Sequence, residues 1–448
     1  MKSYMLKSCL ISSTLFIAAQ TNFSQEWPSF RGPTGDGISP EKVLTAWPAG
    51  GPKHIWQAPT PNGLSAFAIG DGKAFVMLSH PVAGGVPEPA PAPAPEKGKG
   101  KGKGKGGGGG AGVTDVCMAL DASTGQKLWE VPLNTTKHSG AGEGDGARAT
   151  PAVDGNRVYV YSDVMVLMCL DTASGKTIWK QDILNEFGGQ NIGWNSAMSP
   201  MIDGDLVYVA GGGAGQAMLA FNKTTGALAW KSGTDTMTHA TPVIATIGGE
   251  KQVIFFLKSG LVAVNPKTGA ELWKYGFPFK TATAASPIVC GDIVFCSAGY
   301  GVGGAACQVT KTGGGWEAKE LWMLKGDNSP VATLWSTPVH KDGYLYGVFS
   351  YKKYGPAGLM KCVEVKTGKV MWEQAGFGAG QVILAGNCVV ALTDDGQLVL
   401  VEPKPDAYKE LARAQVLSGK CWTPPSLSKG RLYLRGRTES VCLDVAAK

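Results

Sequence analysis

Short runs of alternating hydrophobic and polar residues fill most of the chain, and turn residues separate one run from the next. Alternation with a period of two puts successive side chains on opposite faces of a β-strand, whereas an amphipathic helix needs a period near 3.6. Glycine, at 64 of 448 residues, also recurs too often for long helices. The pattern therefore predicts an all-β protein made of many short hairpins.

One unit recurs along the chain, with the pattern apolar–small–apolar–Asp/Asn–x–x–Thr/Ser–Gly–x–x–x–Trp. Its Asp or Asn can start a turn by accepting backbone N–H bonds, and its glycine supplies the positive φ that closes the turn. The tryptophan on the returning strand can bury a large apolar surface, so we expect it to pack against a neighbouring unit. The clean copies are Asp121 to Trp129, Asp171 to Trp179, Asn222 to Trp230, Asn265 to Trp273 and Glu364 to Trp372.

A second hairpin precedes each of these units, and two hairpins make the four strands of one propeller blade. No repeat hairpin precedes Trp56. The last repeat has the opposite deficit, because its strand ends at Asp444 and no tryptophan strand follows. Joining the two ends closes the ring and removes its open edges. The sequence thus predicts an eight-bladed β-propeller, with four antiparallel strands per blade and a ring closed by the N- and C-terminal strands. The fifth and seventh blades are irregular, and in the seventh Ala412 takes the tryptophan position. The inner hairpins centre near Gly72, Gly155, Gly204, Gly249, Gly291, Gly343, Asn387 and Gly430.

The N-terminus has the features of a secretory signal peptide. Lys2 and Lys7 make the first residues positively charged. The apolar run that follows, residues 10–19, is too short for a stable membrane anchor. We expect a signal peptide over 1–25, an N-terminal arm over 26–53 and the propeller over 54–448. This organisation predicts a periplasmic or secreted protein without a transmembrane segment.

An insertion over residues 81–112 interrupts the first blade between its second and third strands. Alternating Pro and Ala lead into alternating Lys and Gly and then a run of glycines, a composition typical of a stiff spacer joined to a flexible cationic chain. The insertion and the signal hold most of the net charge of +7, so the folded body is nearly neutral and no specific nucleic-acid surface is expected. The segment either captures an anionic polymer or surface at the mouth of the channel, or is a tolerated solvated insertion.

The cysteines mostly occupy small apolar positions of the repeat. Several share a repeat position with alanines of other blades. Because a free cysteine behaves as a small hydrophobe, we expect most of them to be core thiols, although an oxidising compartment permits disulfides. Cys290 and Cys296, which lie within one hairpin, are the expected exceptions.

The repeated unit resembles the pyrroloquinoline-quinone (PQQ) repeat superfamily over roughly residues 50–445, and the segment Trp27 to Gly37 is similar to the leader of exported PQQ-like proteins. The superfamily includes quinoprotein dehydrogenases and also non-catalytic propellers similar to the outer-membrane-barrel assembly subunit. The resemblance therefore implies the fold and leaves the function open.

Most features that the resemblance implies for a quinoprotein dehydrogenase are missing. Such enzymes hold calcium or a lanthanide through carboxylates and use an Asp base, and the alcohol-oxidising members have a disulfide between adjacent cysteines. This chain has sparse acidic residues and no Cys-Cys pair. Its Gly326-Asp327-Asn328 triplet resembles the Gly-Asp-Asn around the catalytic Asp of those enzymes, but it follows the Trp322 strand instead of lying in an inner hairpin. No thioether-haem motif or metal-binding histidine spacing occurs. We predict no catalytic residue, no metal site and no cofactor, with PQQ as the one alternative.

The mouth of the central channel is the candidate binding site. The innermost strand of most blades begins with Ser/Thr-Pro, so the residues just before this pair should surround the axis. An arginine, a histidine and three aromatic residues there could cradle a flat anionic ligand, or they could pack on one another and plug the axis. The residues are Arg148, Trp194, Asn195, His239, Trp335 and Trp422.

These observations leave three hypotheses for the function. The first is a non-catalytic binding or scaffold propeller in the cell envelope, with envelope proteins as partners, and the missing active-site residues favour it. The second is a divergent PQQ-dependent dehydrogenase that oxidises an alcohol or a sugar. The third is a carbohydrate or polyanion binder that uses the insertion and the aromatic mouth.

Overall fold

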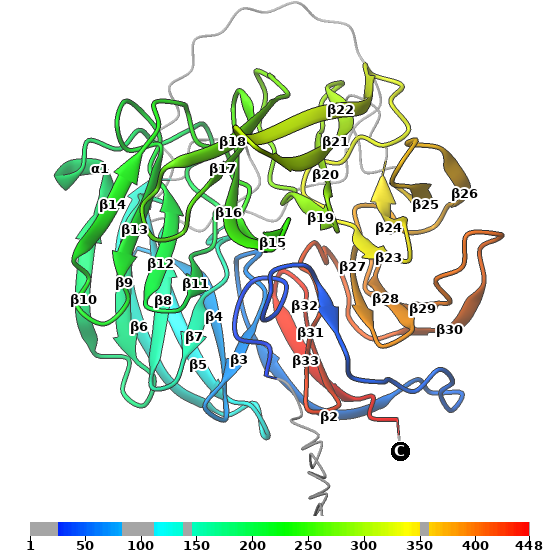
Figure 1. Ribbon diagram of the computed structural model, residues 1–448. Coiled ribbons are helices and arrows are strands. Elements are labelled where there is room, and N and C mark those ends of the chain that lie inside the picture. The colour runs from blue at the N-terminus through cyan, green and yellow to red at the C-terminus, as the bar shows by residue number, and fades with distance from the viewer. Residues whose placement is uncertain (1–25, 83–111, 138–145, 350–357, 448) are drawn as a thin grey trace, which may run out of the picture.

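Eight blades, each of four antiparallel strands, stand in a ring around one axis, which confirms the predicted eight-bladed β-propeller (Figure 1). The structure, a computed structural model, describes residues 26–82, 112–137, 146–349 and 358–447. The expected signal peptide and most of the insertion over 81–112 lie outside these residues. Blue β2 (Lys53–Pro59) and red β33 (Glu439–Asp444) pair antiparallel in one blade, so the predicted closure of the ring is confirmed.

Each blade runs from an innermost strand at the axis to an outermost strand at the rim. Blades 1 to 4 are β3 (Ala68–Gly70), β4 (Lys73–Pro81), β5 (Gly112–Asp121) and β6 (Lys127–Lys137); β7 (Ala152–Asp154), β8 (Arg157–Tyr161), β9 (Val166–Asp171) and β10 (Thr177–Asp182); β11 (Met201–Asp203), β12 (Leu206–Ala210), β13 (Met218–Asn222) and β14 (Leu228–Ser232); and β15 (Val243–Ile247), β16 (Glu250–Leu257), β17 (Gly260–Val264) and β18 (Glu271–Gly276). Blades 5 to 8 are β19 (Ile288–Cys290), β20 (Ile293–Ala298), β21 (Gly303–Thr312) and β22 (Gly315–Lys325); β23 (Val339–Lys341), β24 (Tyr344–Phe349), β25 (Leu359–Glu364) and β26 (Val370–Gln374); β27 (Gln381–Ala385), β28 (Cys388–Leu392), β29 (Gln397–Val401) and β30 (Glu410–Gln415); and β31 (Ser426–Ser428), β32 (Arg431–Arg435), β33 and β2.

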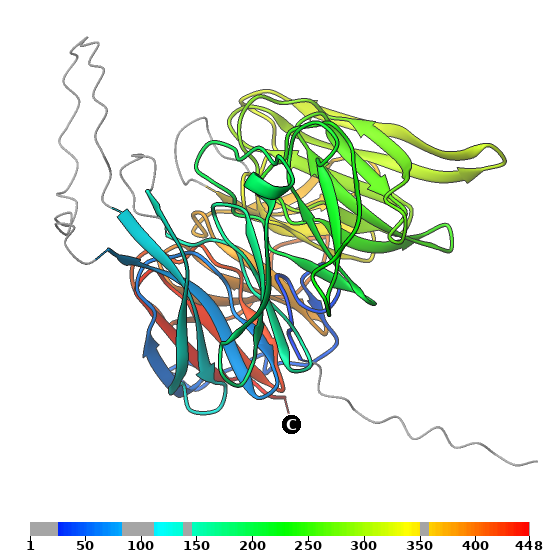
Figure 2. The same cartoon turned by 90° about the vertical axis from the view of Figure 1, so that its left-hand side faces the viewer.

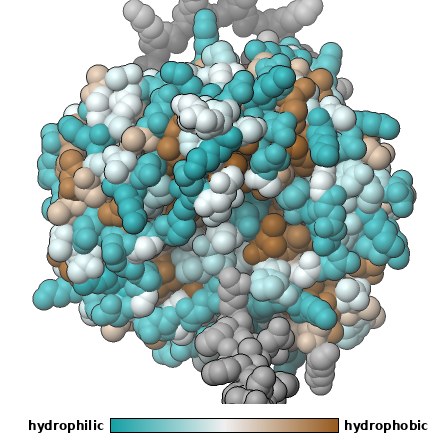
Figure 3. Space-filling view, in the orientation of Figure 1, coloured by the Kyte–Doolittle hydropathy of each residue, from teal (hydrophilic) through white to brown (hydrophobic). Residues whose placement is uncertain are grey.

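Helix is nearly absent from the described residues, where the single α-helix is α1 (Ile183–Glu186). No helix in this part of the chain is long and apolar enough to cross a membrane. The face in Figure 3 is mostly hydrophilic, and its hydrophobic side chains form small separate groups. The hydrophobic core lies instead between neighbouring blades, where the sheets pack face to face.

Repeat tryptophans join neighbouring blades. The ring of Trp230 in blade 3 lies against Gly269 in a turn of blade 4, and its indole N–H donates to the Pro266 oxygen at 2.8 Å. Every outermost strand also carries a β-bulge directly before the tryptophan position, or before Ala412 in blade 7. A bulge re-aims the next side chain, so the repeated bulge directs each tryptophan towards the next blade.

The contact between Trp230 and Gly269 gives a testable expectation. An alanine Cβ at Gly269 would lie 2.4 Å from Trp230 Cε3, and the backbone there has φ +69°. We expect Gly269→Ala to lower the free energy of unfolding by about 3 kcal/mol, through left-handed strain of about 1–2 kcal/mol and displacement of the ring. Gly291→Ala is the matched control, because Gly291 has the same φ of +69° and no atom within 4 Å of the added methyl group. Equal losses in urea unfolding would show that the ring contact does not join the blades.

Blade 5 lacks the repeat turn, and blade 4 compensates for its absence. The hairpin β21–β22 is long and projects beyond the ring, as Figure 2 shows in yellow-green. Trp273 therefore finds no turn carbonyl in blade 5, and its indole N–H donates instead to Gln252 Oε1 of its own blade at 2.6 Å. Gln252 is fully buried, so this bond satisfies polar groups that the interior would otherwise leave unpaired.

The Ser/Thr-Pro residues link neighbouring blades around the channel. Thr150 Oγ1 accepts from the Ala66 backbone N–H at 3.1 Å, and the Thr150 N–H donates in turn to Ser199 Oγ at 2.8 Å. In the same way, the Ser199 N–H donates to Thr241 Oγ1 at 3.0 Å. Each hydroxyl group thus accepts from the preceding blade, a role that the sequence pattern alone does not reveal.

The start of the N-terminal arm, residues 26–39, fills the channel. The Trp27 and Pro28 carbonyl oxygens accept from Ile69 in β3 and Val153 in β7, both at 2.7 Å. Further along, β1 (Ile38–Ser39) pairs in parallel with β27. The innermost strand of a blade has an open edge with unpaired polar groups, and the arm satisfies part of that edge in blades 1, 2 and 7.

Arg31 connects the arm to blades 6 and 7. Its side chain is fully buried, and its guanidinium donates to the backbone oxygens of Thr337 at 2.9 Å, Pro338 at 2.8 Å and Val382 at 3.2 Å. Burial lowers the pKa of Arg31 to about 10, and the charge of Asp36 opposes that shift. The group therefore stays charged at neutral pH and holds three carbonyls on the far side of the channel.

All nine cysteines of the described residues are free and buried, which confirms the expectation of core thiols. The expected exception of Cys290 and Cys296 is wrong. Cys290 packs in a cluster with Phe295 and Cys296 in a different cluster with Trp273, because the two side chains point to opposite faces of blade 5. Burial raises the pKa of both thiols.

Candidate functional site

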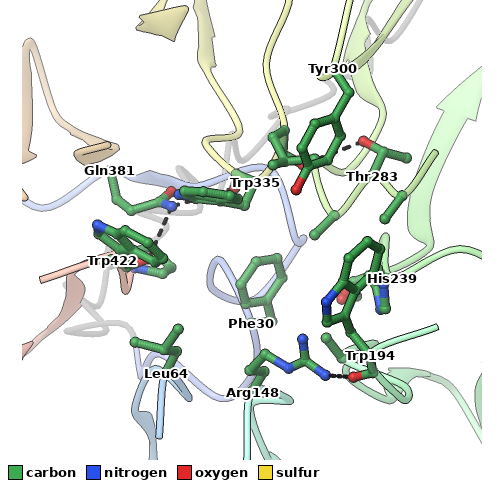
Figure 4. Close-up of a pocket in the computed structure, with 16 residues that line it drawn as sticks. Phe30, Leu64, Arg148, Trp194, His239, Thr283, Tyr300, Trp335, Gln381 and Trp422 are labelled. Carbon is green, nitrogen blue, oxygen red and sulfur yellow. Dashed lines mark hydrogen bonds between the residues drawn. The ribbon is translucent and has the colours of Figure 1, made fainter. Parts of the chain in front are cut away.

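A cavity of about 190 Å³ lies at the mouth of the channel. Phe30 of the arm stands at its centre, surrounded by side chains from several blades (Figure 4). Five of the six predicted residues line it, namely Arg148, Trp194, His239, Trp335 and Trp422. Asn195 does not line the cavity but supports it, because its backbone oxygen accepts from Arg148 Nη2 at 3.3 Å. The structure thus brings the predicted residues together, and ligand binding by them stays a prediction.

Other residues also line the cavity, and the sequence did not predict three notable ones, Phe30, Tyr300 and Gln381. Phe30 comes from the arm and Tyr300 from the turn between β20 and β21. Gln381 begins β27, and its Nε2 donates to the backbone oxygens of Trp422 at 3.1 Å and Trp335 at 3.4 Å. Aligning the innermost strands could have found Gln381, since blade 7 has this residue near the place where other blades have Ser/Thr-Pro.

Two tryptophans form a flat wall on one side of the cavity. The rings of Trp335 and Trp422 stack with centroids 4.7 Å apart and an interplanar angle of 28°. Lys420 Nζ lies 3.7 Å from the Trp422 ring centroid, within the range of a cation–π contact. This wall comes from blades 5–6 and 7–8, so it also ties distant loops together.

Trp194 lies opposite this wall, in an unusual backbone conformation. It is 47% exposed, and both Trp194 and Asn195 have positive φ, at 64° and 60°. A bulky residue with positive φ is rare and is retained where the surroundings hold it. Arg148 does so here, because its Nη2 donates to the Trp194 backbone oxygen. The loop therefore presents a large indole to solvent at a fixed position.

His239 is the buried titratable group of the cavity. Burial lowers its pKa from 6.5 to about 3, helped by the nearby charges of Arg148 and Lys258. The folded protein therefore holds a neutral ring, while the unfolded chain takes up a proton near pH 6.5. Stability is fully present above pH 6.5 and falls as the pH drops from 6.5 towards 3.

We expect protonation of His239 in the unfolded chain to lower the free energy of unfolding of the wild type by about 2 kcal/mol between pH 7 and pH 5. The size follows from about 1.4 kcal/mol for each pH unit below the unfolded pKa. Urea unfolding of wild type and His239→Gln at both pH values measures the effect. The wild type should lose about 2 kcal/mol more than the variant, because glutamine does not titrate. Parallel losses in the two proteins would mean that His239 protonates as easily folded as unfolded.

The cavity fits a quinoprotein cofactor only in part. Its aromatic walls and Arg148 suit a flat anion, but none of the described residues that line it has a carboxylate to hold calcium or act as a base. Asp327 follows β22 and is not among these lining residues. Its volume is also small, since sites for drug-sized ligands usually enclose about 300–1,000 Å³. The lining can bind an aromatic or anionic group, and its titratable side chains are Arg148, His239 and Tyr300.

The fold and this cavity define a class of protein, the eight-bladed PQQ-like repeat propellers. A family profile described as "Outer membrane protein assembly factor BamB" matches residues 114–349, which is more than half of the chain. The chain belongs to this family.

Individual relatives agree with this assignment. The chain is 25% identical to the outer membrane protein assembly factor BamB of Shewanella oneidensis, over 67% of this chain and 85% of that protein. It is 24% identical to BamB of Moranella endobia, over 69% and 77% of the two chains.

Solved structures show the same fold. The crystal structure of BamB from Moraxella catarrhalis matches with a TM-score of 0.51 at 16% identity, over 74% of this chain and 91% of that one. The quinohemoprotein alcohol dehydrogenase from Comamonas testosteroni matches with a TM-score of 0.60 at 14% identity, over 94% and 81%. A BamB protein and an alcohol dehydrogenase share this architecture, so the fold does not decide the activity.

Proposed function

We propose that this protein is an exported, non-catalytic scaffold of the cell envelope, and that it binds an envelope protein through the mouth of its channel. The relatives named above are outer membrane protein assembly factors, which supports a role in the assembly of outer membrane proteins. The observation that carries the proposal is the exposed Trp194, held by Arg148 over a small apolar cavity.

The size and chemistry of the cavity favour a protein partner over a small molecule. A volume of about 190 Å³ accommodates one or two side chains and is too small for a tricyclic cofactor. Tryptophan, tyrosine and arginine are the residues most often found at the centres of protein interfaces. The Trp194 and Tyr300 side chains are 47% and 38% exposed at the edge of the cavity, and Arg148 also lines it.

We expect the double variant Trp194→Ala/Tyr300→Ala to bind the partner at least about 30-fold more weakly, since interface hot spots are worth about 2 kcal/mol or more. Affinity isolation from envelope extracts identifies the partner, and titration of the purified partner gives the affinity. Leu128→Ala/Ile178→Ala is the matched control, because these side chains are 45% and 44% exposed on the outer rim.

An unchanged affinity of the Trp194/Tyr300 variant, or an equal loss in the rim variant, would remove the channel mouth from the interface. Reduction of an artificial dye by the protein with PQQ, calcium and an alcohol would instead support the dehydrogenase, which the aromatic walls and Arg148 make the second candidate.

A further inference from the structure

A buried group of oxygen atoms lies between blades 1 and 2, next to the channel mouth. Ser79 pairs with Asp115 across β4 and β5, and Asp115 pairs with Asn134 across β5 and β6, so three polar side chains form one row. Asp163, in the turn between β8 and β9, faces this row from blade 2. Asp115 and Asp163 are only 0% and 3% exposed. None of these four residues lines the cavity described above.

Hydrogen bonds fix the positions of both carboxylates. Asn134 Nδ2 donates to Asp163 Oδ1 at 3.1 Å, and Asn195 Nδ2 donates to Asp163 Oδ2 at 3.2 Å. Ser79 Oγ donates to Asp115 Oδ1 and itself accepts from a backbone N–H, that of Ala147, at 2.7 Å. The group is therefore preorganised by contacts from both blades.

Among the described residues, two acceptor atoms of the group receive no hydrogen bond from an N–H or hydroxyl group. These atoms, Asp115 Oδ2 and Asn134 Oδ1, are both shielded from solvent. Burial, the charge of Asp163 and a side-chain hydrogen bond with Asp163 raise the pKa of Asp115, while Ser79 and Arg148 oppose that shift. Buried polar groups are nearly always satisfied, and buried carboxylates are paired, protonated or bound to metal. A proton shared by the two carboxyl groups, or a cation bound between them, would satisfy these oxygens.

We propose that a divalent cation, calcium in the best fit, binds between blades 1 and 2, held by Asp115, Asp163 and the amide oxygen of Asn134. Calcium takes carboxylate, amide and water oxygens in a flexible shell of six to eight ligands, whereas magnesium demands a near-ideal octahedron. Each Asp163 oxygen accepts one amide hydrogen bond and keeps lone pairs for a cation. The cation would supply positive charge to Asp115 Oδ2 and Asn134 Oδ1, and water would complete its shell.

The position of the site links it to the loop that carries Trp194. The Asp163 backbone oxygen accepts from Asn191 Nδ2 at 2.9 Å and from the Ser196 N–H at 3.0 Å, on either side of Trp194. Occupancy would hold Asp163 and hence this loop in place. The inference itself does not depend on the proposed function, because its members and its test involve no partner.

Calcium titration of the protein without residues 1–25, after treatment with a chelator, tests the site. We expect one calcium per chain by calorimetry and a rise in Tm of about 3 °C or more at saturating calcium, because a ligand that binds only the folded state stabilises it. Asp115→Asn should fold, since its amide can donate to Asp163, and it should lose both responses. Asp342→Asn, at a carboxylate whose side chain is 84% exposed, should keep both.

Failure of the wild type to bind calcium, with the same Tm in chelator and in calcium, would overturn the site and leave the two carboxylates sharing a proton. A calcium response retained by Asp115→Asn would overturn it as well. If that variant does not fold, Asn134→Ala decides, because loss of one neutral ligand should weaken calcium binding at least about tenfold. An unchanged calcium affinity of Asn134→Ala would show that the amide oxygen is not a ligand and would overturn the proposed site.

Discussion

Replacement of Arg31 with methionine is expected to lower the free energy of unfolding by about 3 kcal/mol and to release the N-terminal arm from the channel. The guanidinium donates to three buried backbone oxygens, of Thr337, Pro338 and Val382. Methionine fills much of the volume but leaves these oxygens without that donor, and an unsatisfied buried acceptor costs about 1–3 kcal/mol. Methionine has no charge to bury, which offsets part of this loss and keeps the total for the three oxygens near about 3 kcal/mol.

Urea unfolding measures the loss, and hydrogen exchange over residues 26–39 reports whether the arm leaves. Arg157→Met is the matched control, because Arg157 also donates to backbone oxygens, those of Lys223 and Thr224, but on a partly exposed surface. We expect the control to lose less than about 1 kcal/mol. Wild-type protection of the arm in Arg31→Met would contradict the role of Arg31 as its anchor.

Trp56→Ala should cost about 4 kcal/mol and loosen the closure of the ring. Trp56 is 7% exposed, and its ring packs on Gly125 of blade 1 and on Tyr433 of blade 8, whose centroid lies 5.9 Å away. Its indole N–H donates to the Ala122 oxygen at 3.1 Å. Truncation of a core tryptophan to alanine typically costs about 3–5 kcal/mol, and here the cavity would open where the two ends of the chain meet.

Thermal and urea unfolding of Trp56→Ala and Ile178→Ala test this expectation. Ile178 precedes the equivalent tryptophan of blade 2 but is 44% exposed, so its truncation should cost less than about 1 kcal/mol. Hydrogen exchange should also rise in β2 and β33 of the Trp56 variant. A loss below about 1 kcal/mol for Trp56→Ala would mean that the paired strands close the ring without the indole.

The regular part of the fold could be predicted because each blade repeats the same local chemistry. Turn glycines with positive φ and tryptophans four residues later, such as Gly226 and Trp230, mark every complete outer hairpin. Features that depend on a missing repeat could not be predicted. Gln252 accepts from Trp273 because blade 5 offers no turn carbonyl, and this change of hydrogen-bond acceptor is visible only in three dimensions.

The arm is the largest element that repeat analysis could not place. Residues 26–39 share no pattern with the blades, so nothing local indicates which surface they cover. The one available signal is Arg31, a lone arginine in a Gly- and Pro-rich stretch, and its three partners lie more than 300 residues away in the sequence.

The channel mouth was predictable in outline for the same reason as the blades. Ser/Thr-Pro marks the start of successive innermost strands, so residues such as Arg148 and His239 necessarily meet at one end of the ring. Phe30 and Tyr300 come from segments outside this register and could not be placed. The proximity of Asp115 to Asp163 was equally hidden, because the two residues belong to different blades and to no shared motif.

Photo-cross-linking in the cell envelope tests the proposed binding face most directly. A photoreactive amino acid at position 194 lies at the channel mouth, and one at Asn156 lies in the turn at the other end of β7. If the channel mouth binds an envelope protein, position 194 yields a defined adduct with that protein and position 156 yields none. No adduct from position 194, or the same adduct from both positions, would contradict the proposal.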